Sequence, residues 1–179
     1  EEVCESMSLR SQEKGLELII DVSHIEVDTV VGDSARLRQV LTNLLGNALK
    51  FTEKGEVIVA ASLHNNGRNW QLNCHVRDTG IGISKEALPV IFEKFRQLDS
   101  SERRTYGGVG LGLHIVKKFT EMLGGQIKVE SEPGTGTTIR VLLPYGDPTV
   151  QPLDSPEVQP RTRFDGKVLI VDDERLVRR

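Results

Sequence analysis

The chain has 179 residues, and its 23 Lys and Arg against 26 Asp and Glu leave a formal net charge of −3 at pH 7. This slightly acidic balance excludes a general attraction to nucleic acid or to an anionic membrane, so a polyanion would need a local binding site. No stretch approaches the roughly 18 consecutive apolar residues of a membrane span. The chain begins Glu1-Glu2-Val3, without Met or a signal-peptide pattern, so we expect a fragment of a longer protein.

Three zones differ in composition. Residues 1–145 carry the regular periodic segments of a folded domain. Residues 146–163 hold four of the seven prolines and show no apolar periodicity, which is typical of an extended linker. Residues 164–179 resume with a short apolar run that is followed by acids. We therefore expect one domain, a proline-rich linker and the first strand of a truncated second domain.

The first half of the domain predicts a strand, a long helix and a β-hairpin. The strand covers residues 16–22. Asp33 is suited to begin a helix that runs to about Phe51, because its carboxylate can accept an unpaired backbone N–H. Apolar residues recur on one face of that helix, at Leu37, Val40, Leu41, Leu44, Leu45 and Ala48. Residues 56–64 and 69–78 are β-rich and flank a turn signal at 65–68.

The second half predicts two further helices and a second hairpin. A short helix follows Ser84, and another begins near Gly110 and ends at Gly124-Gly125, with Ile115, Val116, Phe119 and Leu123 facing inward. Residues 126–132 and 137–143 form the hairpin. Paired strands interrupted by helices favour an α+β fold: a two-layer sandwich whose mixed, mostly antiparallel sheet is covered on one face by about three helices.

The polar side of the long predicted helix carries an unusual stripe. Arg36, Gln39, Asn43, Asn47 and Lys50 follow one another at helical spacing, away from the apolar face. Carboxamide oxygens can ligate a hard cation such as Mg²⁺, and a lysine can meet a phosphate. Asn is a poor helix former, so its presence here needs a reason. Taken alone, the stripe is equally compatible with a solvated helix face.

A glycine-containing turn follows the predicted strand at 69–78. In residues 78–83, Asp-Thr-Gly-Ile-Gly-Ile, the glycines let the backbone bend and approach a flat ligand closely. Asp78 is placed to accept a hydrogen bond from an exocyclic amine, while Ile81 and Ile83 could line a ring. The alternative is an ordinary tight turn capped by the Asp78 side chain.

A second glycine-rich segment opens the predicted helix near Gly110. Residues 107–113 hold four glycines, which expose consecutive backbone N–H groups at a helix N-terminus and suit a polyphosphate. The segment is neither a P-loop nor a dinucleotide fingerprint. Residues 98–106 before it are polar and include Arg103 and Arg104, which suits a lid over phosphates. A glycine hinge and an exposed loop are the alternatives.

As an ordered set, these segments resemble the ATP-binding catalytic domain of sensor histidine kinases. Residues 43–52 (Asn-Leu-Leu-Gly-Asn-Ala-Leu-Lys-Phe-Thr) match the N box, and residues 78–83 the first glycine box. Residues 92–95 (Phe-Glu-Lys-Phe) resemble the F box, residues 107–113 the second glycine box, and residues 134–138 the closing strand motif. The resemblance covers about residues 8–145, with all boxes in the expected order.

The resemblance implies a role for each matching residue. Asn47, with Asn43 beside it, would hold the Mg²⁺ that bridges the ATP phosphates, and Lys50 would contact phosphate. Asp78 would accept the adenine amine, supported through water by Thr138. Phe92 and Phe95 would anchor the lid, although plain core packing fits them equally. The ATP-binding residues implied are Asn43, Asn47, Lys50, Phe51, Asp78, Gly80, Gly82, Ile83, Phe95, Gly108, Gly110, Leu111, Gly112, Leu113 and Thr138.

The resemblance also implies a reaction. Hydrolysing ATPases of the same superfamily place a Glu where Asn43 stands, and an amide cannot take a proton from water near neutral pH. Asn43 therefore favours transfer of the γ-phosphoryl group to a nucleophile, catalysed by positioning and charge neutralisation. We expect a protein histidine kinase catalytic domain with ATP and Mg²⁺ as cofactors. A module that binds ATP without transferring it and a hydrolysing ATPase remain the alternatives.

Several parts of the expected kinase lie outside this chain. None of His24, His64, His75 and His114 resembles the family's phosphoacceptor, which belongs to an upstream dimerisation domain, so the chain is not expected to autophosphorylate alone. Residues 167–174 resemble the first strand of a receiver domain, with Asp172 and Asp173 as part of an incomplete Mg²⁺ site. The parent would then be a homodimeric hybrid histidine kinase that acts on a downstream response regulator.

The cysteines bear on where the protein works. Cys4 and Cys74 have neither CxxC nor metal-ligand spacing, which favours a reducing, cytoplasmic setting. A parent protein anchored in the inner membrane is compatible with this, since sensor segments would precede Glu1.

Overall fold

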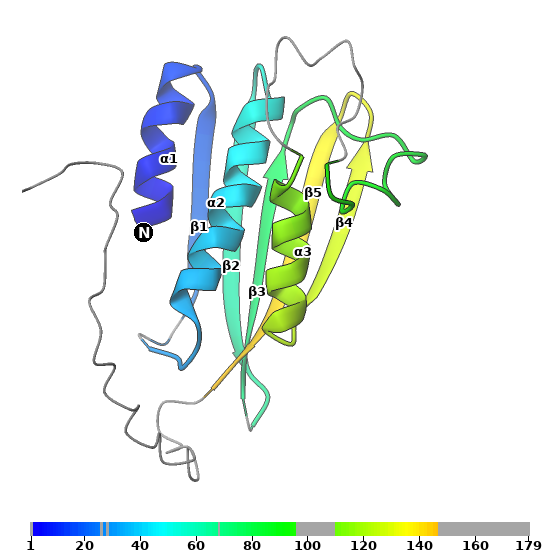
Figure 1. Ribbon diagram of the computed structural model, residues 1–179. Coiled ribbons are helices and arrows are strands. Elements are labelled where there is room, and N and C mark those ends of the chain that lie inside the picture. Colours follow the sequence, from blue (N-terminus) through cyan, green and yellow to red (C-terminus); the bar gives the residue numbers. More distant parts are fainter. Residues whose placement is uncertain (1, 26, 28, 68, 96–109, 147–179) are drawn as a thin grey trace, which may run out of the picture.

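The computed structural model describes residues 2–25, 27, 29–67, 69–95 and 110–146 (Figure 1). Four predicted features lie outside these residues. They are the lid segment at 98–106, Gly108, the linker from residue 147 to 163, and the receiver strand with Asp172 and Asp173. The sequence-based interpretation of those segments stays a prediction.

The centre of the fold is a five-stranded sheet in the order β1-β2-β3-β5-β4. Its strands are β1 (Glu17–His24), β2 (Glu56–Asn65), β3 (Trp70–Asp78), β4 (Gln126–Glu132) and β5 (Gly136–Tyr145). β1 pairs with β2 in parallel, and the other three pairings are antiparallel. The predicted mixed, mostly antiparallel sheet with two hairpins is confirmed.

Three helices cover one face of this sheet in the described part of the chain: α1 (Glu2–Glu13), α2 (Ser34–Phe51) and α3 (Gly112–Met122) (Figure 1). The two-layer α+β class is confirmed, although the three helices are not the predicted three. α1 was not predicted. The expected short helix after Ser84 is wrong, because residues 85–95 form successive turns.

The turns after Ser84 have a local cause. Val90 N–H donates to Ala87 O at 3.0 Å, and Glu93 N–H donates to Val90 O at 3.0 Å, each across three residues. Pro89 has no N–H to donate and disfavours helical geometry for the residue before it. The segment therefore closes turn by turn without continuing as an α-helix.

Helix α2 forms as its sequence predicts. The Asp33 carboxylate accepts a hydrogen bond from Arg36 N–H at 2.9 Å and begins the helix. On its apolar face Val40, Leu44, Leu45, Ala48 and Leu49 are buried, and Leu37 and Leu41 pack partly buried against the core.

The core lies between the helices and the sheet. Alternate residues of the central strands face the helices and are buried, namely Val57, Val59, Leu72, Cys74, Val76, Ile139, Val141 and Leu143. Both cysteines are free, and burial raises the pKa of the Cys74 thiol to about 12. No helix in the described part of the chain is long and apolar enough to span a bilayer.

Candidate functional site

The predicted site segments meet at one edge of the sandwich. Figure 1 shows the C-terminal end of α2, the N-terminal end of α3 and the end of β3 along the same edge. The turn between β4 and β5 lies there as well. The fold thus brings together motifs that are separated in the sequence by whole strands and helices.

Asp78, the last residue of β3, is held by backbone donors. Its Oδ1 accepts hydrogen bonds from Gly80 N–H at 2.9 Å and from Thr137 N–H at 3.2 Å. Among the described residues, no hydrogen bond reaches Oδ2. Burial raises the pKa of Asp78, and the two N–H donors partly oppose that rise. The result is a half-buried carboxyl group with one oxygen fixed and one left for a ligand.

The turn after Asp78 is packed backbone against backbone. A Cβ on Gly80 would collide with the Phe51 carbonyl oxygen at the end of α2. Gly82 has a φ of +69°, and a Cβ there would collide with the Glu132 carbonyl oxygen. Close approach to other backbone segments therefore requires glycine at both positions. The predicted approach of this turn to a flat ligand stays a prediction.

Polar bonds tie the same turn to the β4–β5 hairpin. Ile81 O accepts from Gly134 N–H at 2.8 Å, and Ile83 N–H donates to Ser131 Oγ at 2.8 Å. Ser131 Oγ also bonds Thr137 Oγ1 at 2.9 Å. The Ile81 side chain stays 43% exposed, so it remains free to meet a ligand ring.

The structure corrects the placement of Thr138. Thr137, not Thr138, pairs with Asp78 in the β3–β5 ladder and lies on the face of the sheet that the helices cover. Thr138 pairs with Arg77 and points to the opposite face, because successive side chains of a strand alternate. Thr137 therefore takes the position beside Asp78 that the sequence analysis gave to its neighbour.

The two carboxamides of α2 face the start of α3. A Cβ placed on Gly112 would lie 3.4 Å from Asn43 Oδ1 and 3.6 Å from Asn47 Nδ2. Asn43 Nδ2 donates to Gln39 O at 3.0 Å, which orients the amide oxygen of Asn43 away from its own helix backbone. The fold thus places Asn43 and Asn47 beside Gly112 of the second glycine segment.

The other members of the stripe differ in where they lie. Lys50 Nζ lies 4.6 Å from the centroid of the Phe51 ring, and partial burial lowers the pKa of Lys50. Arg36, at the opposite end of α2, pairs with Asp33 at 3.3 Å. Lys50 and Phe51 therefore belong to the edge with Asp78, and Arg36 does not.

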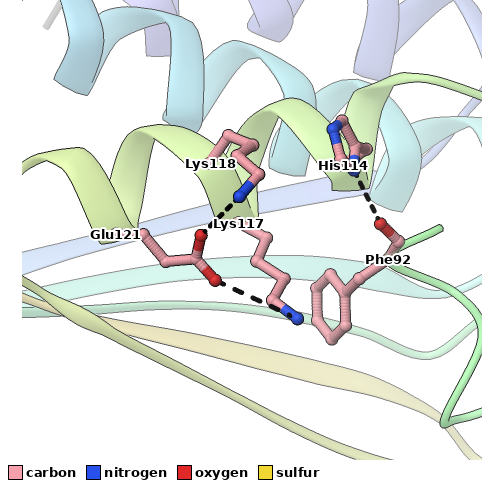
Figure 2. Close-up of polar contacts among 5 residues, drawn as sticks. All are labelled: Phe92, His114, Lys117, Lys118 and Glu121. Atoms are coloured by element: carbon pink, nitrogen blue, oxygen red, sulfur yellow. Dashed lines mark hydrogen bonds and ion pairs between the residues drawn. The ribbon is translucent and has the colours of Figure 1, made fainter. Parts of the chain in front are cut away.

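The start of α3 contacts the F-box segment through side chains and backbone. Figure 2 shows His114 Nδ1 bonded to the Phe92 carbonyl oxygen at 2.9 Å, with Lys117 Nζ 5.8 Å from the Phe92 ring centroid. Phe95 N–H donates to Gly110 O at 3.1 Å. Phe95 has a φ of +61° and is 68% exposed, so it is no core residue.

The first turn of α3 has the features of an anion site. Leu111 caps it without a side-chain hydrogen bond, and Gly110 precedes it with a φ of +71°. No acidic residue stands in the first turn, so the N–H groups there keep their positive potential. Gly112 and Leu113 begin the helix beside the carboxamides of α2.

Carboxamide oxygens are the candidate ligands for a Mg²⁺ ion at this site. Among the described residues, His, Cys, Asp and Glu side chains nowhere gather in a group of three or more that could hold a metal. The candidate ligands are the amide oxygens of Asn43 and Asn47, which are hard donors of the type that Mg²⁺ accepts when phosphate and water complete its shell.

The chain matches one family model over residues 32–147, described as histidine kinase-, DNA gyrase B- and HSP90-like ATPase. Because the match covers more than half of the 179 residues, the chain belongs to this family.

Relatives within the family are histidine kinases. The chain is 46% identical over 146 residues to hybrid signal transduction histidine kinase L of Dictyostelium discoideum. This match covers 80% of this chain and 8% of that protein. It is 43% identical over 166 residues to the autoinducer 2 sensor kinase/phosphatase LuxQ of Vibrio cholerae, covering 90% of this chain and 19% of the relative. The chain thus spans less than a fifth of either protein.

Solved structures agree with the fold. Full-length ShkA in complex with AMPPNP superposes with a TM-score of 0.69 at 39% identity, over 81% of this chain and 29% of that one. The mycobacterial sensor histidine kinase MprB gives a TM-score of 0.60 at 27% identity, over 81% of this chain and 95% of that one.

Proposed function

We propose that this chain binds Mg-ATP at the edge formed by α2, the 78–83 turn and the start of α3. The observation that carries the proposal is Asp78, whose Oδ1 is held by two backbone N–H groups while Oδ2 accepts no bond from the described residues. A carboxylate in this state is suited to accept the exocyclic amine of adenine. Ile81, Ile83 and Phe51 would border the base, and Thr137 would support it. The ShkA relative was solved with an ATP analogue.

The phosphates would lie toward α3. The Asn43 amide oxygen and the Asn47 amide nitrogen lie beside Gly112. The oxygens of these two carboxamides would hold the Mg²⁺ that neutralises phosphate charge. The N–H groups of the first turn of α3 would contact phosphate oxygens, with Gly108, Gly110, Leu111 and Leu113 shaping that end. Lys50 would add a point charge.

The reaction best supported by this residue set is phosphoryl transfer. Asn43 offers no general base for water, and phosphoryl transfer needs chiefly positioning and charge neutralisation. His114 is the histidine nearest to the start of α3, and its Nδ1 is engaged by Phe92 O. The acceptor would therefore be a histidine on another domain. We place the chain as the catalytic part of a protein histidine kinase in two-component signalling.

The proposed whole protein is a hybrid kinase. It would carry an upstream dimerisation and phosphoacceptor domain, residues 1–145 as catalytic domain, residues 146–163 as linker, and a receiver domain that begins at about residue 164 with Asp172 and Asp173. It would work as a homodimer and pass phosphoryl groups to a response regulator. Relatives named as hybrid or sensor kinases support this arrangement.

The direct test mixes the chain with Mg²⁺, [γ-³²P]ATP and a separately made dimerisation domain. We expect label on a histidine of that domain, stable to alkali and lost in acid. Binding of ATP without label would leave a nucleotide-binding scaffold, and release of inorganic phosphate without label would indicate a hydrolysing ATPase. Absence of ATP binding would overturn both the site and the function.

A further inference from the structure

The C-terminal end of α2 is closed by a residue from outside the site. An α-helix leaves its last four carbonyl groups without partners inside the helix. Lys14, between α1 and β1, donates from Nζ to Leu49 O at 2.5 Å, to Thr52 O at 3.0 Å and to Lys50 O at 3.4 Å. One ammonium group therefore serves three carbonyls at the point where α2 ends.

The two other carbonyls of this end have different partners. Ala48 O accepts from Thr52 N–H at 3.1 Å and from Thr52 Oγ1 at 2.7 Å. Phe51 O accepts from Ile81 N–H at 3.3 Å, which joins α2 to the turn that follows Asp78. The end of α2 thus lies between Lys14 on one side and the Asp78 turn on the other.

The segment that presents Lys14 is itself tightly bonded. Ser11 O accepts from Lys14 N–H at 3.1 Å and from Leu16 N–H at 3.0 Å, and the buried Ser11 hydroxyl donates to Leu16 O at 2.6 Å. Gly15 completes the turn with a φ of +66°. The backbone beneath Lys14 is therefore fixed, and only the side chain has to be ordered for its amine to reach α2.

We infer that Lys14 is a positioning residue that holds the last turn of α2, and with it Lys50, Phe51 and the Asp78 turn, in the geometry needed for the nucleotide. Two observations carry this inference. A cation beside the last carbonyls of a helix stabilises that turn. The Phe51 carbonyl, one residue from a carbonyl that Lys14 bonds, is the acceptor for Ile81 N–H. Lys14 thereby ties α1 to the ATP site, and the inference rests on the proposed function.

The test compares Lys14→Met with Lys54→Met. Lys54 is exposed and lies two residues beyond Thr52, so both changes remove one positive charge near the same helix end. We expect Lys14→Met to weaken ATP binding by roughly three- to tenfold, and Lys54→Met by less than about twofold. Lys14→Arg keeps a cationic donor and should restore most of the affinity. Equal ATP affinities for Lys14→Met and Lys54→Met would overturn the inference.

Amide hydrogen exchange gives a readout that does not depend on ATP. In Lys14→Met, exchange of Thr52 N–H and Ile81 N–H should accelerate by roughly three- to tenfold, while Val40 N–H, in the first half of α2, should keep its rate. Unchanged exchange at Thr52 and Ile81 would contradict the inference even if the wild type binds ATP. If the wild type does not bind ATP, the proposed function fails and exchange alone decides on Lys14. If Lys14→Met does not fold, Lys14→Arg must bind ATP more tightly than Lys14→Gln.

Discussion

The Asp78 turn and the start of α3 border the same candidate site but are held in different ways. Around the turn, Gly80 and Gly82 pack directly on carbonyl groups of other segments, and Asp78 is fixed by backbone N–H donors. Among the described residues, contacts between the start of α3 and the F-box segment include the bond of His114 to Phe92 O, the approach of Lys117 to the Phe92 ring and the bond from Phe95 N–H to Gly110 O. The Asp78 turn is thus packed backbone against backbone, whereas side chains make two of these three contacts at the start of α3.

The difference has a functional meaning for an ATP site. A rigid pocket for the base reduces the ordering needed when the ligand binds. A phosphate end held by side-chain contacts can change its geometry without disturbing the core, which would suit the phosphoryl transfer that we propose. Mutations that add a side chain at Gly80 or Gly82 should therefore affect folding and binding together, whereas mutations at the start of α3 should affect the fold only slightly.

The largest effect is expected from Gly82→Ala. The new Cβ would collide with the Glu132 carbonyl oxygen at a backbone φ of +69°, so we expect a loss of roughly 3 kcal/mol in the free energy of unfolding. Gly134→Ala is the matched control, because Gly134 also has positive φ (+78°) but open space around it, and should lose roughly 1 kcal/mol. Urea unfolding measures both; equal losses would contradict backbone packing at Gly82.

Asp78→Asn should separate binding from stability. Loss of the acceptor charge should weaken ATP binding by roughly tenfold or more, which calorimetry measures. Asp21→Asn, a change at an exposed carboxylate on β1, is the control and should leave ATP affinity unchanged. In the wild type, a similar affinity for ATP and GTP would count against Asp78 as the residue that recognises adenine.

The pH dependence of the unliganded protein follows from the same residue. Burial raises the pKa of Asp78 in the folded state, so the folded protein holds that proton more tightly than the unfolded chain. The stability contribution is present below the ordinary aspartate pKa of about 3.9 and is lost as the pH rises through the folded-state value. Asp78→Asn should therefore be at least as stable as the wild type at pH 7 without ATP. If Asp78→Asn were clearly less stable than the wild type at pH 7 without ATP, the predicted direction of the effect would be contradicted.

Asn47→Asp tests the phosphate end with a smaller expected effect. A carboxylate beside the polyphosphate should weaken ATP binding in the absence of Mg²⁺ by roughly fivefold and reduce phosphotransfer, while the fold stays intact. Gln39→Glu makes the same change of amide to carboxylate earlier on α2 and serves as control. Labelling of the acceptor domain that is unchanged by Asn47→Asp would remove Asn47 from the metal role.

The smallest effect is expected from His114→Ala. Loss of the bond to Phe92 O should lower the free energy of unfolding by about 1 kcal/mol and weaken ATP binding by roughly twofold. Lys118→Ala, which removes an exposed partner of Glu121 on the same helix (Figure 2), should change neither by a measurable amount. If His114→Ala lowered the free energy of unfolding as much as Gly82→Ala, the predicted difference between the start of α3 and the Asp78 turn would be contradicted.

Much of the fold could be predicted because its signals are local. The α2 apolar face and its Asp33 cap lie within one segment, and the turn after Asp78 needs glycines at particular positions. Helix α1 has no clear apolar face in its sequence. Leu9 in this helix is 62% exposed, whereas Met7 is buried through contacts with the rest of the core. Pro89 opposes the helix expected after Ser84, because it lacks an N–H and disfavours helical geometry at the residue before it.

The roles of Thr137 and Lys14 depend on contacts between residues that are far apart in the sequence. The choice between Thr137 and Thr138 requires the register of β5 against β3, since one residue of shift reverses the face. Strand alternation from Ile139, Val141 and Leu143 could have indicated Thr137. The role of Lys14 rests on bonds to residues 35 to 38 positions away, which periodicity and spacing do not reveal.

The most direct test of the central claim is an NMR titration of the ¹⁵N-labelled chain with Mg-ATP. If one edge of the sandwich holds the nucleotide, the backbone N–H signals of Gly80 and Gly112 shift together with the same dissociation constant, while Arg140 on the open face of the sheet stays unchanged. Shifts at Arg140 without shifts at Gly80 and Gly112, or no shifts at all, would contradict the account.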